Sequence, residues 1–174
     1  MTWILGVLVV IAGTYVIGYF LPVTMRGSGE RTVTQTPDMV FRAVLDGQNF
    51  PMNADMVKAV HLDGDGRWRE ELGNSEVRVE TVEAKAPVRV LRRYSDSKYP
   101  IAAETEILIA PAQRGTYVAV STRITLVNGH VLAPVLRLLL FGFKGVQKGV
   151  VAYLDQLEKG LNQGKVAPLA NAAE

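Results

Sequence analysis

The chain begins with an unbroken apolar stretch. Residues 3–21 (WILGVLVVIAGTYVIGYFL) contain no charged side chain, and Pro22 follows them. As a helix with a rise of about 1.5 Å per residue, this stretch would reach roughly 28 Å, close to the thickness of the hydrocarbon core of a bilayer. Trp3 and Tyr19 stand near its two ends, where amphipathic rings favour the membrane interface. The pattern predicts a transmembrane anchor over residues 1–22.

Two other interpretations of this stretch are a cleaved signal peptide and a buried core helix. A signal peptide normally begins with basic residues and ends at small residues, whereas only Met1 and Thr2 precede this run and it ends in YFLP. A core helix is seldom uncharged for so long. An uncleaved anchor is therefore favoured. Arg26 and Arg31 flank only its C-terminal side, which predicts a single-pass protein of the inner or plasma membrane with an outside N-terminus and a cytoplasmic domain.

Beyond the anchor the pattern changes to that of strands. Residues 23–28 are expected to form a short tether and residues 30–35 a first strand. Thr36-Pro37-Asp38 has the residue types that start a helix, and the apolar residues from Val40 to Leu45 form one stripe on it. Turn signals of Gly, Asn, Asp and Pro then separate six strand-like segments, which predicts an antiparallel meander. These strands are expected at residues 57–62, 67–72, 76–83, 88–94, 103–110 and 116–127.

The last part of the chain has a helical period. Apolar residues from Leu132 to Leu161 recur at intervals of three and four, which predicts one amphipathic helix of about 28 residues. Residues 162–174 are rich in Gly, Ala and Asn and are expected to fray. The succession of strand, short helix, six strands and long helix predicts an α+β domain over residues 29–161.

This order of elements resembles the START-like superfamily, also known as SRPBCC, of polyketide cyclases/dehydrases and lipid-transport proteins. Two segments carry the resemblance, ERTVTQTPDMVFRAVLDGQNFP at the start of the domain and VVAYLDQLEKGL at its end. The matching positions are Pro37, Val40, Phe41, Asp46, Pro51, Tyr153, Leu154 and Leu157. The resemblance implies a helix-grip fold, in which a curved antiparallel sheet of about seven strands wraps a long C-terminal helix and leaves a cavity between them. Family members often have Trp directly after the Phe-Pro pair that follows the first helix of the domain. Here that pair is Phe50-Pro51, and Met52-Asn53 follows it.

The composition excludes several kinds of functional site. The chain has no Cys and only two His, which excludes thiolate metal sites and a Cys nucleophile and makes a His-rich metal site an unfavoured prediction. A net charge of +2 is too small to indicate a nucleic-acid partner. The sequence has no nucleophile elbow, Walker loop or dinucleotide fingerprint. We therefore predict no cofactor and no catalytic residue. Glu104 and Glu106, with Arg123 on the next strand, indicate a solvated face with a cross-strand ion pair.

Two groups of residues are candidates for binding. The cavity candidates are Trp68, Tyr94, Tyr99, Gly142, Phe143 and Val146. The three aromatic residues are more typical of an ordinary core or rim than of a cavity. Gly142 either makes room for a ligand or marks a break in the helix. The candidates for membrane or partner contact are Trp3, Tyr19, Arg26, Leu138 and Leu140. The two leucines fall off the apolar stripe of the last helix, so they are covered either by lipid or a partner subunit or by the wrapping sheet.

These observations favour a membrane-anchored binding module for an apolar small molecule such as a lipid, an isoprenoid or a quinone. One alternative is an accessory or structural subunit of a membrane complex, whose anchor packs against other helices. A second alternative is an enzyme of the cyclase or dehydratase type, which is ranked last because no acid–base constellation stands out. The expected partners are membrane lipid together with either that small molecule or the subunits of a complex.

Overall fold

The computed structural model describes residues 2–52, 56–126, 130–142 and 144–164, and the side chains of residues 2, 4, 5, 8 and 11 lie outside this description. Seven strands and four helices are found in these ranges. In chain order they are α1 (Thr2–Phe20), β1 (Thr24–Val33), α2 (Pro37–Leu45), β2 (Ala59–Gly64), β3 (Arg67–Leu72), β4 (Ser75–Lys85), β5 (Arg89–Asp96), β6 (Ile101–Ala112), β7 (Gly115–Leu126), α3 (Ala133–Gly142) and α4 (Gly145–Asn162). The predicted α+β class and the six-strand meander are confirmed.

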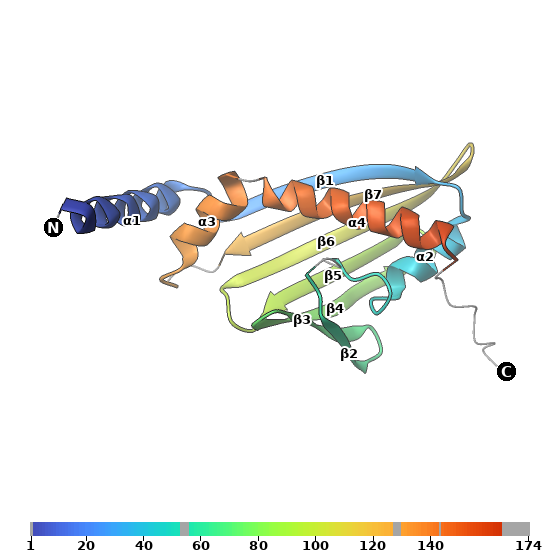
Figure 1. The fold of residues 1–174 in the computed structure, drawn as a ribbon. Coiled ribbons are helices and arrows are strands. Elements are labelled where there is room, and N and C mark those ends of the chain that lie inside the picture. Colours follow the sequence, from blue (N-terminus) through green and yellow to red (C-terminus); the bar gives the residue numbers. More distant parts are fainter. Residues whose placement is uncertain (1, 53–55, 127–129, 143, 165–174) are drawn as a thin grey trace.

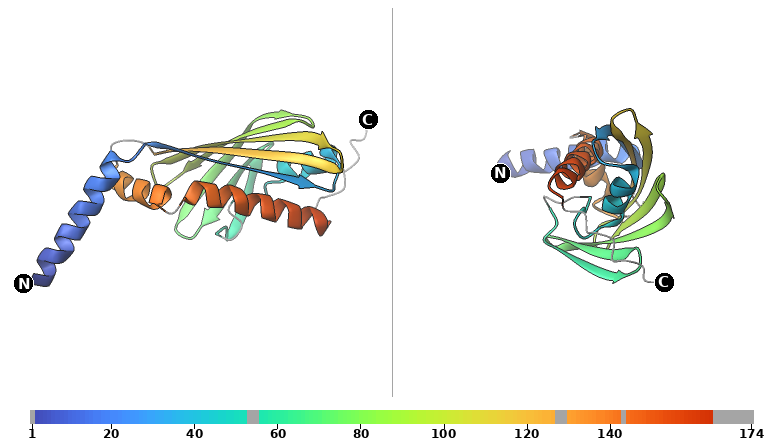
Figure 2. Two further views of the ribbon diagram at one scale, coloured as in Figure 1. Left: turned by 90° about the horizontal axis from the view of Figure 1, so that it is seen from above. Right: turned by 90° about the vertical axis from the view of Figure 1, so that its right-hand side faces the viewer.

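The strands form one antiparallel sheet in the order β1-β7-β6-β5-β4-β3-β2. Only β1 is out of chain order, because it pairs with the last strand, β7. The sheet curves, and α4 lies along its concave side, packed mainly against β1 and β7 (Figures 1 and 2). α2 closes the end of this space that is farthest from α1. A curved sheet around a C-terminal helix is the arrangement that the sequence analysis expected.

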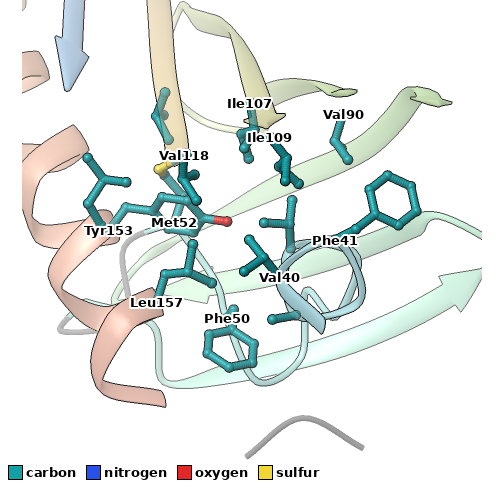
Figure 3. Packing of buried hydrophobic residues seen from close by; sticks show 14 of the residues in the cluster. Val40, Phe41, Phe50, Met52, Val90, Ile107, Ile109, Val118, Tyr153 and Leu157 are labelled. Atoms are coloured by element: carbon teal, nitrogen blue, oxygen red, sulfur yellow. The ribbon is translucent and has the colours of Figure 1, made fainter. Parts of the chain in front are cut away.

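The core fills the space between the sheet, α2 and α4. Inward-facing residues alternate with exposed ones along the strands, as the two-residue period of a β-strand requires. Figure 3 shows Tyr153 and Leu157 of α4 facing the same interior as Val40 of α2 and Ile107 of β6. A second, smaller cluster of Met25, Leu126 and Val146 lies where α3, α4 and the start of β1 meet.

The first strand begins earlier than the sequence pattern indicates. β1 starts at Thr24, so residues 24–28, which were expected to form a tether, pair with β7 in continuous register. Glycine weakens a strand, and Gly27 and Gly29 hide the pattern here. The glycines are used for close packing, because a Cβ on Gly27 would lie 2.9 Å from backbone atoms of Val146 and Gln147. The N-terminal turn of α4 therefore rests directly on the β1 backbone.

The predicted single C-terminal helix is wrong in its continuity. The structure has two helices, α3 and α4, and Lys144 between them adopts a left-handed conformation with φ 49°. Of the two interpretations of Gly142, the break is the one that the structure shows. Leu140 packs against the small cluster around Val146, and Leu138 is half-buried, whereas Leu139 and Phe141 are exposed. Contact of Leu138 and Leu140 with lipid or a partner stays a prediction.

α1 projects away from the sheet (Figure 2), is connected to β1 by residues 21–23 and packs against α3. Large apolar side chains are exposed along its described positions: Trp3, Val7, Val9, Val10, Tyr15, Val16, Ile17, Tyr19 and Phe20. Within the described parts of the chain, no helix reaches the length and apolarity needed to cross a membrane. The membrane anchor expected from residues 3–21 therefore stays a prediction.

Candidate ligand-binding site

A polar cluster is buried inside the otherwise apolar interior. Trp68 and Glu70 point inward from β3, Arg92 and Tyr94 point inward from β5, and Tyr153 points inward from α4. Glu70, Arg92 and Tyr153 are each 0% exposed. Side chains alternate between the two faces of a strand, so residues 68 and 70 share one face of β3, and residues 92 and 94 share one face of β5. We name these five residues the polar cluster.

Trp68 links the two charged members of the cluster. Its indole Nε1 donates a hydrogen bond to Glu70 Oε1 at 3.0 Å. The guanidinium carbon of Arg92 lies 4.8 Å from the centroid of the Trp68 ring, a cation–π arrangement. Arg92 Nη2 also donates to the carbonyl of Val44, in the last turn of α2. A helix C-terminus carries partial negative charge, so this contact favours the buried cation.

Burial controls the protonation of the cluster. It raises the pKa of the Glu70 carboxyl, and the Trp68 N–H, the Arg92 cation and the Met52 backbone only partly oppose that rise. Burial lowers the pKa of Arg92, but Tyr94, Tyr153 and Glu70 outweigh it, so the net pKa is raised and the side chain stays cationic. Burial also raises the pKa of both tyrosines, which keeps them as neutral phenols. The interior therefore holds a cation beside two neutral hydroxyl groups.

Several polar atoms of the cluster make no hydrogen bond of good geometry among the described residues, although Arg92 lies close enough to the Tyr94 and Tyr153 hydroxyls to oppose the rise in their pKa. They are Glu70 Oε2, Arg92 Nε, Arg92 Nη1 and the hydroxyl oxygens of Tyr94 and Tyr153. Leaving such atoms unpaired in a protein interior is costly, and the great majority of buried polar groups are satisfied by protein or ordered water. Five such atoms in one cluster indicate a place where a water molecule or the polar group of a ligand fits.

A surface pocket lies beside the segment that follows α2 and contacts this cluster. It has a volume of about 560 Å³ and lies between the C-terminal half of α4, the link at residues 48–51 and the segment 57–60. Phe50 lines it while being only 1% exposed, and a Cβ on Gly160 would collide with the Phe50 ring. The Met52 backbone, two residues further along the link, contacts Glu70. The link Phe50–Met52 therefore separates the pocket from the polar cluster.

The structure brings some of the predicted cavity residues together and separates others. Trp68 and Tyr94 both belong to the polar cluster. Tyr99 lies outside it, half-buried in the loop between β5 and β6, with the Lys98 amine 5.6 Å from its ring centroid. Val146 belongs to the small cluster near α3, away from the core between sheet and α4. Gly142 is the last residue of α3, and position 143, the predicted Phe143, lies outside the described residues.

Sequence reasoning missed the charged members of the site. Glu70 and Arg92 stand in the charged segments RWREEL and RVLRRYSD, which look like solvated strands. Their parity was the available signal, because each shares a strand face with a buried aromatic residue two positions away. Tyr153 was recognised only as part of the apolar stripe of the last helix and as one of the positions that carry the START-like resemblance.

The outer face of the sheet carries the expected ion pairs with different partners. Glu106 Oε1 lies 2.7 Å from Arg89 Nε, and Glu104 Oε1 lies 3.5 Å from Arg93 Nη2. The predicted partner Arg123 is directly opposite Glu104 in the register of β6 and β7, but the Glu104 carboxylate is paired toward β5 instead. All these side chains are partly exposed, so the pairs contribute little to stability.

The raised pKa of Glu70 predicts an unusual pH dependence of stability. The native state holds this proton to a higher pH than the unfolded chain, whose ordinary value is 4.5. Stability is therefore gained as the pH falls through the native pKa and lost as it rises. Relative to Glu70→Gln, the wild-type free energy of unfolding should fall with rising pH by up to about 1.4 kcal/mol per unit within that window. Urea unfolding measured from pH 4 to 8 checks this.

The neighbouring carboxylate provides the control for that experiment. Glu71 lies on the same strand but its side chain is 53% exposed. Glu71→Gln should leave the shape of the wild-type stability profile unchanged. Parallel profiles for the wild type and Glu70→Gln would show that burial does not perturb Glu70.

Comparison with known proteins gives matches in structure alone. No protein-family profile matches the chain, and no curated protein matches it by sequence. A conserved protein of Geobacillus kaustophilus superposes with a TM-score of 0.61 at 15% identity, covering 80% of this chain and 97% of its own. A protein of Thermus thermophilus gives 0.59 at 18% identity, with 80% and 99% covered. DynU16, from the dynemicin biosynthetic locus, gives 0.54 at 15% identity, with 81% and 48% covered. These similarities show a shared fold of curved sheet and helix, which is compatible with the START-like resemblance.

Proposed function

We propose that this protein is a membrane-tethered binding module for an apolar small molecule that carries a polar or anionic group. The observation on which the proposal depends is the set of five buried polar atoms in the polar cluster that lack a hydrogen bond of good geometry. An apolar interior with a few convergent polar groups is typical of small-molecule sites. The apolar body of the ligand lies in the pocket between α4, residues 48–51 and residues 57–60, and its polar group meets Arg92 and the tyrosine hydroxyls once the link Phe50–Met52 shifts.

The chemistry of the cluster limits the polar group. Arg92 supplies a permanent cation with N–H donors, and the phenols of Tyr94 and Tyr153 both donate and accept hydrogen bonds. A carboxylate, a phenolate-like oxygen or a quinone carbonyl matches these donors, whereas an ammonium group does not. Access runs through the 560 Å³ pocket beside the link Phe50–Met52, which must shift to admit a ligand.

The tether is the second part of the proposal, and the uncharged run of residues 3–21 supports it. A chain that carries an apolar ligand benefits from lying next to lipid, where such molecules are concentrated. We place the domain on the cytoplasmic side, because Arg26 and Arg31 follow the run.

Removal of one hydroxyl group tests the ligand site with little disturbance. The full chain is purified from membranes in mild detergent, and its bound small molecules are measured by native mass spectrometry. We expect one apolar molecule per chain, and Tyr153→Phe should lose most of it because the ligand's polar group loses a hydrogen-bond partner. If no ligand meets the hydroxyl, Tyr153→Phe should instead raise the free energy of unfolding by about 1 kcal/mol with no change in ligand content.

Tyr99→Phe is the matched control, since Tyr99 lies outside the polar cluster. It should keep the wild-type ligand content. Wild-type protein that contains no small molecule and migrates with a larger assembly would overturn the binding module in favour of an accessory subunit. Release of the chain from membranes by alkaline carbonate would overturn the tether.

A further inference from the structure

The sequence segments that meet where α1 joins the domain contain basic residues and no Asp or Glu. Among the described residues, six arginines elsewhere form ion pairs with Asp or Glu: Arg31, Arg67, Arg69, Arg78, Arg89 and Arg93. Residues 1–29 and 107–154 contain no Asp or Glu at all. Arg26 at the start of β1 and Arg123 near the end of β7 are opposite each other in register, and both are exposed. The segments that meet at α1 therefore carry only positive charge.

α3 is fixed against the C-terminal turn of α1. A Cβ on Gly18 would collide with the backbone carbonyl of Pro134, so the glycine allows the two helices to touch. Arg137 Nη1 donates to the carbonyl oxygen of Tyr19 at 3.2 Å. This contact places a buried cation, 6% exposed, at the negative end of the α1 dipole. The hydrogen bond to Tyr19 therefore fixes the Arg137 guanidinium beside the C-terminal end of α1.

A pocket of about 720 Å³ lies between these helices. We name it the α1–α3 pocket, and its lining residues are Tyr15, Tyr19, His130, Val131, Ala133, Pro134 and Arg137. It combines one cation and two phenol side chains with apolar walls and contains no carboxylate. A guanidinium fork matches the geometry of phosphate oxygens, and an apolar wall suits the first carbons of an acyl chain. An acid-free pocket of this composition favours an anionic, amphipathic ligand.

The depth of the pocket agrees with a lipid ligand. Residues 15 and 19 lie in the last turns of the apolar run, where a spanning helix reaches the headgroup layer. Large apolar side chains on the adjoining segment are also exposed, namely Val131, Leu132, Leu139 and Phe141. We propose that the α1–α3 pocket binds the phosphate group of an anionic phospholipid, with Arg137 as the phosphate ligand. This inference rests on the proposed tether and is independent of the polar cluster.

Competition between two phospholipids tests the proposal. The full chain in detergent micelles is titrated with phosphatidylglycerol or phosphatidylcholine, and binding is followed by native mass spectrometry. We expect one phosphatidylglycerol to bind at least about tenfold more tightly than phosphatidylcholine, and Arg137→Gln should remove that preference, as the loss of a charged hydrogen bond implies. Arg114→Gln is the matched control, because Arg114 lies in the β6–β7 turn at the far end of the sheet.

A second pair of variants removes the pocket and leaves its arginine in place. Gly18→Leu should push α3 away and abolish the preference, whereas Gly13→Leu, on the same helix with open space around it, should retain it. Equal binding of the two lipids, an unchanged Arg137→Gln variant, or inorganic phosphate that binds as tightly as phosphatidylglycerol would each overturn the proposal. Failure of the chain to insert into phosphatidylcholine vesicles would overturn the tether itself, which separates the two failures.

Discussion

Glu70→Leu is expected to lower the free energy of unfolding by about 3–5 kcal/mol. The substitution removes the only carboxylate of the polar cluster and leaves Arg92 fully buried. An arginine cannot escape this situation by losing its proton, because its pKa stays far above any working pH. The interior would then hold an uncompensated cation. Urea unfolding of the full chain in detergent, followed by circular dichroism, measures the loss.

Removing the cation instead of the carboxylate should lower the free energy of unfolding by less. This difference would show that the effect depends on the buried charge. In Arg92→Leu the remaining Glu70 can take up a proton, a change that its raised pKa already favours. The double variant Arg92→Leu/Glu70→Leu should be more stable than Glu70→Leu alone, since a buried charged pair can often be replaced by apolar residues at little cost. Strictly additive losses in the double variant would show that the two groups do not interact.

The sequence predicts the strands well where the signals are local. Residues 67–72 were expected as a strand and form β3, because the Asp-Gly turn before them and the Gly-Asn turn after them set both ends. The start of β1 was missed for a non-local reason. Gly27 disfavours a strand by itself, and only the approach of α4, far away in the chain, accounts for it.

The periodic pattern of apolar residues also could not predict the break in the C-terminal helix. The apolar stripe continues across residues 142–145, so spacing alone favours one helix. The break depends on the backbone of Lys144, which adopts a left-handed conformation that residues other than glycine seldom take. The consequence is functional, because α3 turns away from the axis of α4 and is free to rest on α1 at Gly18.

The polar cluster shows why functional residues are harder to predict from the sequence than the fold. Strand parity places Glu70 and Arg92 on the buried face, but residue type argues for the solvent. The conflict is resolved only in three dimensions, where Trp68 contacts both groups and α2 supplies a carbonyl oxygen to Arg92. Local signals that disagree with burial are expected at functional sites more than elsewhere.

Trp68→Ala has the second large expected effect, because this side chain joins the apolar core to the polar cluster. The indole is 3% exposed, and it packs so closely on the link after α2 that a Cβ on Gly47 would collide with its ring. Its removal leaves a large cavity, takes away the ring beneath Arg92 and deletes the hydrogen bond to Glu70. We expect a loss of about 3–5 kcal/mol in the free energy of unfolding.

Two further variants separate the contributions of the Trp68 ring. Trp68→Phe keeps most of the apolar bulk but leaves Glu70 Oε1 without its indole donor, so a smaller loss of about 1–3 kcal/mol is expected. Trp3, the only other tryptophan, is 88% exposed on α1, and Trp3→Ala should leave the unfolding of the domain unchanged. That variant also makes Trp68 the sole tryptophan, so emission excited selectively from tryptophan reports the exposure of the polar cluster during unfolding. Emission from Trp68 that is already typical of water in the native state would contradict the buried cluster, because an indole between a guanidinium and a carboxylate in an apolar interior has no access to solvent.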